Sequence, residues 1–341
     1  MNKNQVYVCT SIFNLYISVL LAIANKQKGI KSKLIYFNMD SAFDAYEAQL
    51  LSCSYFDDVI GVKDLRNRKI KGLKEVLANI FFYRKQVNKY FDRFVEKGKL
   101  EELIGDSEIN VFSTTLLFQK YLFFNFGKNY FRILEDGLIV YREIKNPITR
   151  AIKLIHGIPD RPADSFFKEI WVSQPDQLPN KARAKSKKFE LTDLVENLSR
   201  EKKKEVVDFF LKDLSIQKNN IKNALIITQP LSEDNFISEQ YKINLYKKIA
   251  REYKAKGYQV YLKNHPREKT SYQEVIPEID GIIPGSFPLE VLNLNQSVQF
   301  DKGITIFSSA LHNCNFINEK VFLGESWDPK IHSELQKRFK M

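Results

Sequence analysis

The feature that most constrains this chain is an alternation of short apolar runs with longer segments of helical periodicity. Residues 73–97 give the longest such segment, with apolar residues recurring every three or four positions. Runs typical of β-strands occur at residues 5–9, 31–38, 57–62, 106–113 and 130–137. This alternation predicts α/β structure with a doubly wound parallel sheet.

The same alternation starts again near residue 223. Strand-like runs are expected at residues 224–230, 258–263, 303–307 and 321–325. A chain of 341 residues has the length of roughly two domains. We therefore expect two Rossmann-like domains with a cleft between them. They span residues 1–155 and 221–341, the second ends in a helix, and residues 156–220 form a basic, partly helical connection.

Composition narrows the classes of partner and compartment. The formal net charge of +12 favours anionic partners such as nucleotides, nucleic acid, an acidic glycan or an acidic membrane surface. The three cysteines are far apart in sequence, which fits neither a disulfide framework nor a zinc site and predicts a reducing compartment. Asn14 and Ser18 interrupt the apolar stretch near the start, so we expect neither a signal peptide nor a membrane span there.

Three polar clusters stand at the ends of predicted strands, where ligands bind in open α/β sheets. The first is Glu135-Asp136-Gly137. A carboxylate there is suited to accept a proton from a hydroxyl group. Successive residues of an extended chain point to opposite sides, so only one of the two faces the ligand. An ordinary Asp-Gly turn is the alternative interpretation.

The second cluster is His265-Pro266, one of few places where the chain offers an imidazole. Proline prevents further sheet pairing, so the histidine lies in a loop. An imidazole can donate a proton or a charge-assisted hydrogen bond to a leaving phosphate. Lys263 and Arg267 add positive potential nearby. A loop histidine without a role is the alternative.

The third cluster is Ser308-Ser309, between a predicted strand and a predicted helix. Serine is a common N-cap, but a helix N-terminus with two hydroxyl groups also suits a phosphate. A fourth element is the loop with Pro288, followed by Glu290. This carboxylate is placed to accept both hydroxyls of a ribose, or it only complements the helix dipole.

Several motifs are absent from the sequence. It has no GxxxxGK[ST] phosphate loop, no GxGxxG and no HExxH. A diphosphate leaving group usually needs a metal or several cations. A monophosphate leaving group can be stabilised by hydrogen-bond donors and an imidazole. We therefore expect no metal and no cofactor.

Taken together and in this order, the clusters resemble those of the bacterial sialyltransferases, which have a GT-B scaffold. The opening VYVCTSIFNLYIS and the FPLE segment are most similar to glycosyltransferase family 52, which includes lipooligosaccharide and capsule sialyltransferases. Bacterial polysialyltransferases share the motifs. The resemblance implies an α/β fold of GT-B type, with two Rossmann-like doubly wound domains facing a central cleft.

For the first domain, the resemblance implies an acceptor-side role. Asp136 would be the general base on the acceptor hydroxyl, with Glu135 as the alternative. Thr10 and Ser11, after the first strand, would lie near the transferred sugar or the acceptor.

For the second domain, the resemblance implies nucleotide binding. His265 would bind and protonate the leaving CMP phosphate, and Ser308 and Ser309 would hold that phosphate. Glu290, with Pro288 beside it, would bind the cytidine ribose.

The implied reaction is a metal-independent, inverting transfer of sialic acid from CMP-sialic acid. The acceptor would be a galactose-type or sialic acid hydroxyl on lipooligosaccharide or capsule. The expected partners are a nucleotide-sugar donor, a glycan or glycolipid acceptor and a second copy of the chain in a homodimer, but no nucleic acid. The expected location is the cytoplasm, with peripheral contact at the inner face of the membrane.

Two alternatives stay open at this level. A related GT-B-like transferase would use CMP-Kdo or CDP-glycerol to build a surface polymer, and the acidic motif favours the sialyl donor over these. A basic nucleic-acid-binding protein is compatible with the charge. However, the sequence has no RRM, KH or helix-turn-helix signature, and its basic residues are spread out.

Overall fold

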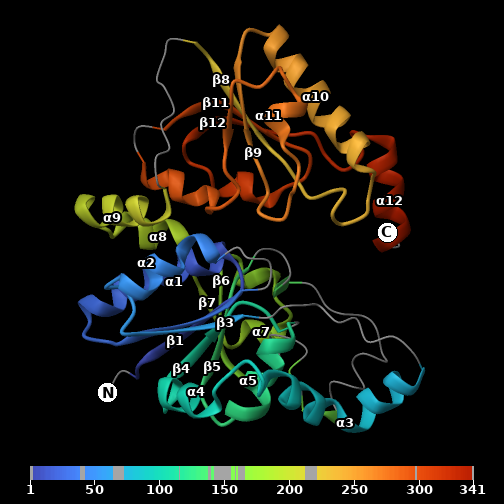
Figure 1. Ribbon diagram of the computed structural model, residues 1–341. Coiled ribbons are helices and arrows are strands. Elements are labelled where there is room, and N and C mark those ends of the chain that lie inside the picture. The colour runs from blue at the N-terminus through green and yellow to red at the C-terminus, as the bar shows by residue number, and fades with distance from the viewer. Residues whose placement is uncertain are drawn as a thin grey trace. The chain divides into compact units, whose positions relative to one another are not determined.

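The structure is a computed structural model, and it divides the chain into two compact units, Met1–Leu198 and Ser199–Met341 (Figure 1). It describes residues 3–38, 43–63, 73–114, 116–136, 140–141, 155–157, 159, 166–211, 221–295 and 298–339. Within these ranges the side chains of residues 73–81, 309, 338 and 339 are left out of the description.

The first unit is built on a seven-stranded sheet in the order β3-β2-β1-β4-β5-β6-β7. All of its strand pairs are parallel. The strands are β1 (Gln5–Cys9), β2 (Ser32–Asn38), β3 (Asp58–Lys63), β4 (Glu108–Val111), β5 (Phe131–Leu134), β6 (Phe167–Val172) and β7 (Ser186–Lys188).

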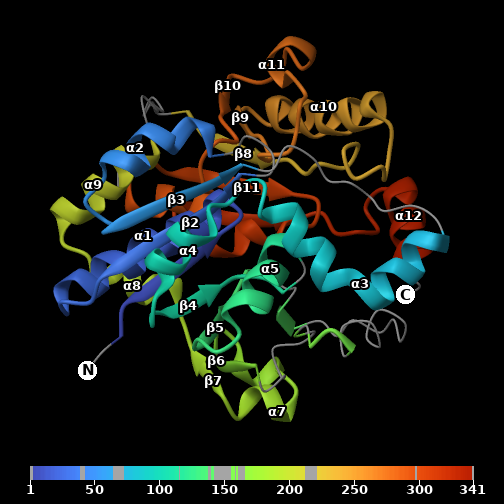
Figure 2. The same cartoon turned by 60° about the horizontal axis from the view of Figure 1, so that its bottom comes forward.

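Helices cover both faces of this sheet (Figures 1 and 2). On one face lie α1 (Ile12–Gln27), α2 (Glu47–Ser52) and α8 (Leu191–Glu196), and on the other lie α3 (Leu73–Phe91), α4 (Lys97–Ile104) and α5 (Leu117–Phe126). Val6 and Val8 pack with α3, α4 and α5 in one core cluster. Because both faces are covered, every residue of β1 is buried, as its continuous apolar run predicts. The described residues of this unit also contain the short helical turns η1 (Asp44–Tyr46), η3 (Pro175–Gln177) and α7 (Asn180–Arg183).

The second unit has a five-stranded parallel sheet in the order β10-β9-β8-β11-β12. Its strands are β8 (Asn223–Ile227), β9 (Gln259–Lys263), β10 (Gly281–Ile283), β11 (Phe300–Thr305) and β12 (Ile317–Phe322). Its helices are α9 (Arg200–Phe210), α10 (Glu239–Ala255), α11 (Tyr272–Val275), η4 (Leu289–Leu294), η5 (Ser309–Asn313) and α12 (Pro329–Phe339). Residues of α10, α11 and α12 share one core cluster with the central strands.

The predicted fold class is confirmed, because each unit is a doubly wound, Rossmann-like α/β unit. The strand order reverses between β1 and β4 in the first unit and between β8 and β11 in the second. Ligands of open α/β sheets bind beyond the carboxyl ends of the strands at such reversals. These two strand ends are therefore the places to look for a site.

The division of the chain differs from the predicted domain bounds. Residues 156–220, expected to form a connection, are shared between the units. Their first part contains β6 and β7, which extend the first sheet, and their last part contains α9 of the second unit. Because this region is rich in prolines and lysines, the sequence did not predict β6 and β7. The strands with which they pair are remote in sequence.

Two local predictions agree with the structure, and the bounds of the last strand differ. Helix α1 begins at Ile12, and Ser11 caps it by accepting the Asn14 N–H. Gly257 follows α10 with a φ of 81°, a left-handed conformation that glycine adopts without strain. The last strand spans Ile317–Phe322 rather than 321–325. Within the described part of the chain, no helix combines the length and apolar character that a membrane span needs.

Candidate active site

The acidic motif follows β5, and its two carboxylates have different surroundings. Glu135 accepts hydrogen bonds from the Ser173 N–H, from the Ser173 hydroxyl at 3.1 Å and from the Tyr141 hydroxyl at 3.0 Å. Ser173 follows β6, so Glu135 fixes the end of the neighbouring strand. Asp136 instead interacts with Asn14 of α1. Gly137 lies outside the described residues.

Asp136 has the environment of a proton acceptor. Burial raises the pKa of its carboxyl, the Asn14 side chain partly opposes this shift, and the charge of Glu135 adds to it. A raised pKa makes the carboxylate a better base at neutral pH. The thiol of Cys9 lies close by, and burial raises its pKa to about 12. Cys9 therefore stays protonated and is no nucleophile.

Asn14 is fully buried and its orientation is fixed by Thr10. Its Oδ1 accepts hydrogen bonds from the Thr10 N–H at 3.2 Å and from the Thr10 hydroxyl at 3.1 Å. Its Nδ2 must then point the other way. This Nδ2 makes no hydrogen bond of ordinary geometry, yet it is near enough to Asp136 to favour the charged carboxylate.

The structure gives Thr10 and Ser11, predicted to lie near a substrate, clear structural partners. Thr10 orients the Asn14 amide, and Ser11 caps α1. Asn14 itself was missed as a site residue, because in the sequence it only interrupts an apolar stretch. The signal that could have identified Asn14 is a polar residue in the first turn of a buried helix.

His265 follows β9, and its ring is held in one tautomer. Its Nδ1 accepts a hydrogen bond from the Arg267 N–H at 3.2 Å, so the proton of the neutral ring is on Nε2. Burial, with Arg267 and Lys263, lowers the pKa of His265 to about 4. The ring is therefore neutral near pH 7 and offers an Nε2–H donor. Arg267 is itself paired with Asp234, at 2.6 and 3.0 Å.

The loop with Pro288 and Glu290 packs against the His265 loop. A Cβ on Gly285 would lie only 3.0 Å from the Asn264 carbonyl oxygen and 3.2 Å from the His265 backbone. This close approach explains a glycine there. Pro288 and Glu290 are both buried; Pro288 is the N-cap of η4, and Glu290 lies in its first turn.

Lys263 is a buried lysine at the same strand end. Its Nζ lies 4.7 Å from the centre of the Phe287 ring, which is in the Pro288 loop. Burial lowers the pKa of Lys263 to about 7, against the opposing charges of Glu290 and Glu268. The sequence pointed to Lys263 only as a source of positive potential.

Ser308 follows β11 and begins the next turn. Its hydroxyl accepts the Ala310 N–H at 3.4 Å, and its own N–H donates to the Thr305 hydroxyl at 3.2 Å. Ser309 is the first residue of η5, and its side chain lies outside the described part. The N-cap interpretation of Ser308 is thus confirmed.

Within each unit, the predicted residues gather at the carboxyl ends of the strands. Thr10 follows β1 and Asp136 follows β5 in the first unit. His265 follows β9 and Ser308 follows β11 in the second, on either side of β8. The second set flanks the reversal of strand order, which suits a nucleotide.

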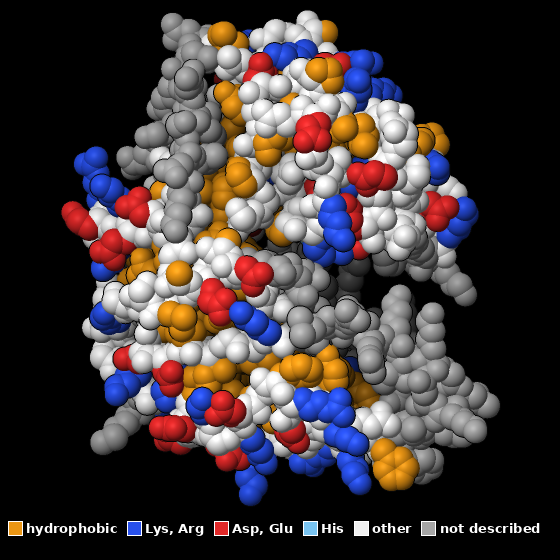
Figure 3. Space-filling view, in the orientation of Figure 1, with side chains coloured by type: hydrophobic (Ala, Val, Ile, Leu, Met, Phe, Trp, Pro, Cys, Tyr) orange, Lys and Arg blue, Asp and Glu red, His pale blue; other side chains and the backbone are white. Residues whose placement is uncertain are grey.

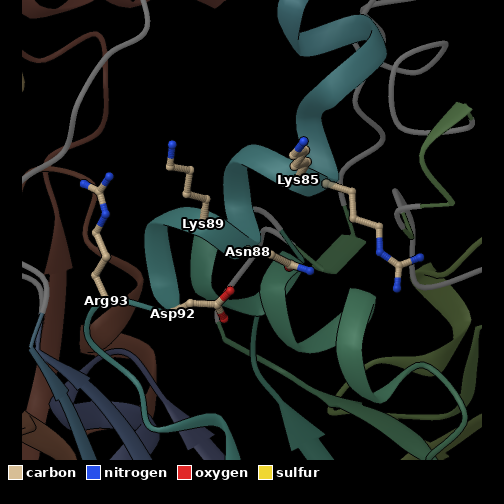
Figure 4. A pocket seen from close by; sticks show the side chains of 6 residues that line it. Lys85, Asn88, Lys89, Asp92 and Arg93 are labelled. Carbon is tan, nitrogen blue, oxygen red and sulfur yellow. The ribbon is translucent and has the colours of Figure 1, made fainter.

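A separate hollow in the first unit lies along α3 and the turn that follows it (Figure 4). None of the predicted site residues lines it. Three of its lining residues have internal partners. Arg84 donates to the Phe124 carbonyl at 2.6 Å, Asp92 accepts from the Tyr121 hydroxyl at 3.1 Å, and Asn88 accepts from the Asn125 amide at 3.1 Å. The lining residues are Arg84, Lys85, Asn88, Lys89, Asp92 and Arg93.

Charges of both signs are mixed over the described surface shown in Figure 3. The net charge of +12 is therefore not gathered into one patch on that face. Among the residues that the structure describes, no group of three or more His, Cys, Asp or Glu side chains is placed to hold a metal ion.

A family comparison identifies the chain. The model of glycosyltransferase family 52 matches residues 55–330. The chain belongs to glycosyltransferase family 52. The matched part of this glycosyltransferase contains Asp136, His265 and Ser308, whereas Thr10 and Asn14 precede it.

Known proteins are similar to the glycosyltransferase in sequence or in structure. An uncharacterised protein of Haemophilus influenzae is 29% identical over 280 residues, which are 81% of this chain and 82% of that protein. The UDP-GlcNAc 2-epimerase of Neisseria meningitidis, solved with UDP-GlcNAc, has a TM-score of 0.50 at 14% identity, over 90% of this chain and 78% of that one. That of Methanocaldococcus jannaschii has a TM-score of 0.47 at 11% identity, over 98% and 92%. The fold is of GT-B type, with two Rossmann-like units.

Membership in the family makes the protein a transferase that takes a sugar from a nucleotide donor and passes it to a glycan acceptor. The resemblance drawn from the sequence motifs is thereby confirmed at the level of the family.

Proposed function

We propose that this glycosyltransferase moves sialic acid from CMP-sialic acid to a galactose-type or sialic acid hydroxyl of a surface glycan, such as lipooligosaccharide or capsule. The observation that carries the proposal is the pairing of two strand-end groups within a family 52 chain. One is a carboxylate with a raised pKa, Asp136, and the other is a neutral imidazole that carries its proton on Nε2, His265.

The proposed reaction is one inverting displacement. The acceptor oxygen attacks the anomeric carbon of sialic acid while Asp136 takes the hydroxyl proton. The bond from that carbon to the CMP oxygen breaks, and CMP leaves with the electron pair. Positive charge that develops on the sugar ring is offset in part by the carboxylate of the donor.

In this proposal the second unit stabilises the leaving phosphate. The lowered pKa of His265 leaves its ring neutral before the donor binds. His265 therefore acts on the phosphate by donating a hydrogen bond from Nε2. Hydrogen-bond donors placed where charge develops lower the barrier without any metal. Ser308 and Ser309 hold the same phosphate, and Glu290, with Pro288, binds the ribose.

The test is CMP release by the purified protein with CMP-sialic acid, CMP-Kdo and CDP-glycerol in parallel. Each donor is tried with lactose-type and sialylated acceptors. We expect acceptor-dependent release from CMP-sialic acid only, and its loss in Asp136→Asn and His265→Ala with the fold retained by circular dichroism. Turnover of CMP-Kdo or CDP-glycerol instead would replace the sialyl donor by that alternative.

We also propose that the protein contacts the inner face of the membrane through the outer face of α3 and the turn that follows it. Lys85, Lys89 and Arg93 follow one another at intervals of four residues, are exposed, and make no ion pair with any residue that the structure describes (Figure 4). Phe82, on the same side of the helix by spacing, is 59% exposed. Cations beside an exposed aromatic ring suit an anionic lipid surface. The expected homodimer stays a prediction, to be tested by sedimentation.

A further inference from the structure

The carboxylate of Glu268 holds the backbone of the His265 loop. Its Oε2 accepts the His265 N–H at 2.7 Å and also contacts the Thr228 hydroxyl. Its Oε1 accepts the Tyr272 hydroxyl at 2.7 Å and lies 3.7 Å from the Nζ of Lys242. The side chains of Glu268 and Lys242 are both fully buried. Every donor around this carboxylate therefore comes from the second unit itself.

Thr228, which follows β8, joins this carboxylate to the end of β9. Its N–H and its hydroxyl oxygen each lie 3.1 Å from the Lys263 carbonyl oxygen, and the His265 N–H lies 3.3 Å from the same hydroxyl. The hydroxyl has one proton, and its shorter contact is with Glu268. Thr228 is 1% exposed, so solvent cannot replace these bonds.

Gln229, the residue after Thr228, fixes the loop that contains Ser308. The side-chain oxygen of Gln229 accepts the Phe307 N–H at 3.1 Å, one residue before Ser308. The Gln229 N–H donates to the buried Tyr246 hydroxyl at 2.7 Å. The end of β8 thus fixes both loops that flank the reversal of strand order.

Stability alone does not account for Glu268. Burying a carboxylate costs free energy unless it is paired and hydrogen-bonded, and buried ion pairs are often replaceable by apolar residues without loss of stability. Lys242 already has Glu233, with both oxygens at 2.9 Å, and Glu239 at 3.1 Å. A third carboxylate is not needed to neutralise it. What Glu268 adds is an acceptor for the His265 backbone.

We propose that Glu268 is a positioning residue for His265, and that Thr228 transmits this restraint from the end of β8. It fixes the loop so that the His265 Nε2–H is aimed at the donor phosphate before the donor binds. This inference rests on the proposed function, because His265 is taken there to contact the phosphate. Glu268 itself touches no reacting atom.

The test uses two graded pairs in the full chain. Glu268→Leu removes the acceptor, whereas Glu268→Gln keeps one oxygen for the His265 N–H. Thr228→Val removes the hydroxyl at nearly constant side-chain shape, whereas Thr228→Ser keeps the hydroxyl. Tyr272→Phe is the matched control, because it removes a donor from Glu268 but leaves the His265 contact. Thermal unfolding of each variant checks that it is folded.

We expect kcat to fall by as much as ~100-fold in Glu268→Leu and Thr228→Val, the scale for a misplaced catalytic group. Glu268→Gln should be intermediate, and Thr228→Ser and Tyr272→Phe near wild type, with kcat affected more than the KM for CMP-sialic acid. NMR titration of the ring gives a readout that needs no turnover. The pKa of His265 should rise from about 4 towards its ordinary value as the loop loses its buried position.

Full kcat and an unmoved His265 titration in folded Thr228→Val and Glu268→Gln would overturn the inference. So would an equal loss in Tyr272→Phe, which would mean general destabilisation. Should Glu268→Leu fail to fold, the Thr228 pair decides the question. If the wild type does not turn over CMP-sialic acid but the His265 titration responds as expected, the positioning role stands and the proposed function fails.

Discussion

At the scale of single residues, Glu135 and Asp136 differ because of what surrounds them, although they are chemically alike. The oxygens of Glu135 accept three hydrogen bonds from Ser173 and Tyr141. Asp136 has the Asn14 amide beside it and a pKa raised by burial. The first carboxylate is therefore best suited to hold structure, and the second to accept a proton.

Replacing Asp136 with asparagine should reduce turnover by about 100-fold or more, the range of general base catalysis. It should also raise the free energy of unfolding at neutral pH. Folding raises the pKa of this carboxyl, so the folded protein binds its proton more tightly, and stability falls as the pH rises through that range. The gain of the variant should vanish below about pH 3, where the carboxyl is protonated in both states.

Urea unfolding at several pH values measures this effect, with Glu135→Gln as the control. Glu135→Gln should lose stability and keep most of its turnover, because its hydrogen bonds are structural. If Glu135→Gln abolished turnover while Asp136→Asn kept it, the base would be Glu135.

Asn14→Ala should shift the acidic limb of the kcat/KM profile to higher pH. The Asn14 side chain lowers the pKa of Asp136, so its loss lets burial raise that pKa further. Ser18→Ala is the control, because the Ser18 hydroxyl donates to the backbone carbonyl of Asn14 at 2.8 Å and not to Asp136. An acidic limb that stays in place in Asn14→Ala would mean that the amide does not tune the base.

At the scale of elements, the two ends of the first sheet have different tasks. The carboxyl ends present the candidate site, while the amino ends are joined by Arg132 of β5. Its guanidinium donates to Glu169 of β6 at 2.8 Å and to Glu108 of β4 at 2.9 Å. It also reaches Gln5 of β1 at 3.0 Å. One side chain therefore links four neighbouring strands.

Arg132→Met should destabilise the protein by about 3–5 kcal/mol, because it leaves the partly buried Glu108 without its cation and Glu169 with only the exposed Lys187. Denaturant unfolding measures the loss, and turnover per folded molecule should be unchanged, since no site residue contacts Arg132. Lys63→Gln removes an exposed cation paired with Glu47 and should change stability by at most about 1 kcal/mol. Equal effects of the two substitutions would contradict the role given to Arg132.

The outer face of α3 should bind vesicles that contain anionic lipid. Each basic residue near such a surface contributes about 1 kcal/mol, so Lys85→Gln, Lys89→Gln and Arg93→Gln together should weaken binding on the order of 100-fold. Sedimentation with phosphatidylglycerol-containing and neutral vesicles measures this. Replacing Lys202, Lys203 and Lys204 of α9 removes the same charge and should have a smaller effect. Equal losses would mean that only net charge matters.

At the scale of the whole molecule, the two units carry separable parts of the proposed reaction. His265 and Ser308 belong to the second unit and Asp136 to the first. We expect Asp136→Asn to bind CMP with the wild-type Kd, and His265→Ala to bind it at least about 10-fold more weakly, the loss of one charge-assisted hydrogen bond. Isothermal titration calorimetry with CMP measures both. Weakened CMP binding in folded Asp136→Asn would argue against this separation.

The sequence by itself determined the fold class, most strand positions and the motifs that indicate the family. Periodicity and strand-end composition are local properties, so they survive without knowledge of the fold. Only the tertiary structure assigned β6 and β7 to the first sheet, because strand pairing joins residues that are remote in the chain. It also decided that Asp136 rather than Glu135 lies beside Asn14, that the His265 ring is neutral with its proton on Nε2, and that Glu268 holds that loop. These properties depend on burial and on hydrogen-bond partners from other elements, which no local pattern specifies.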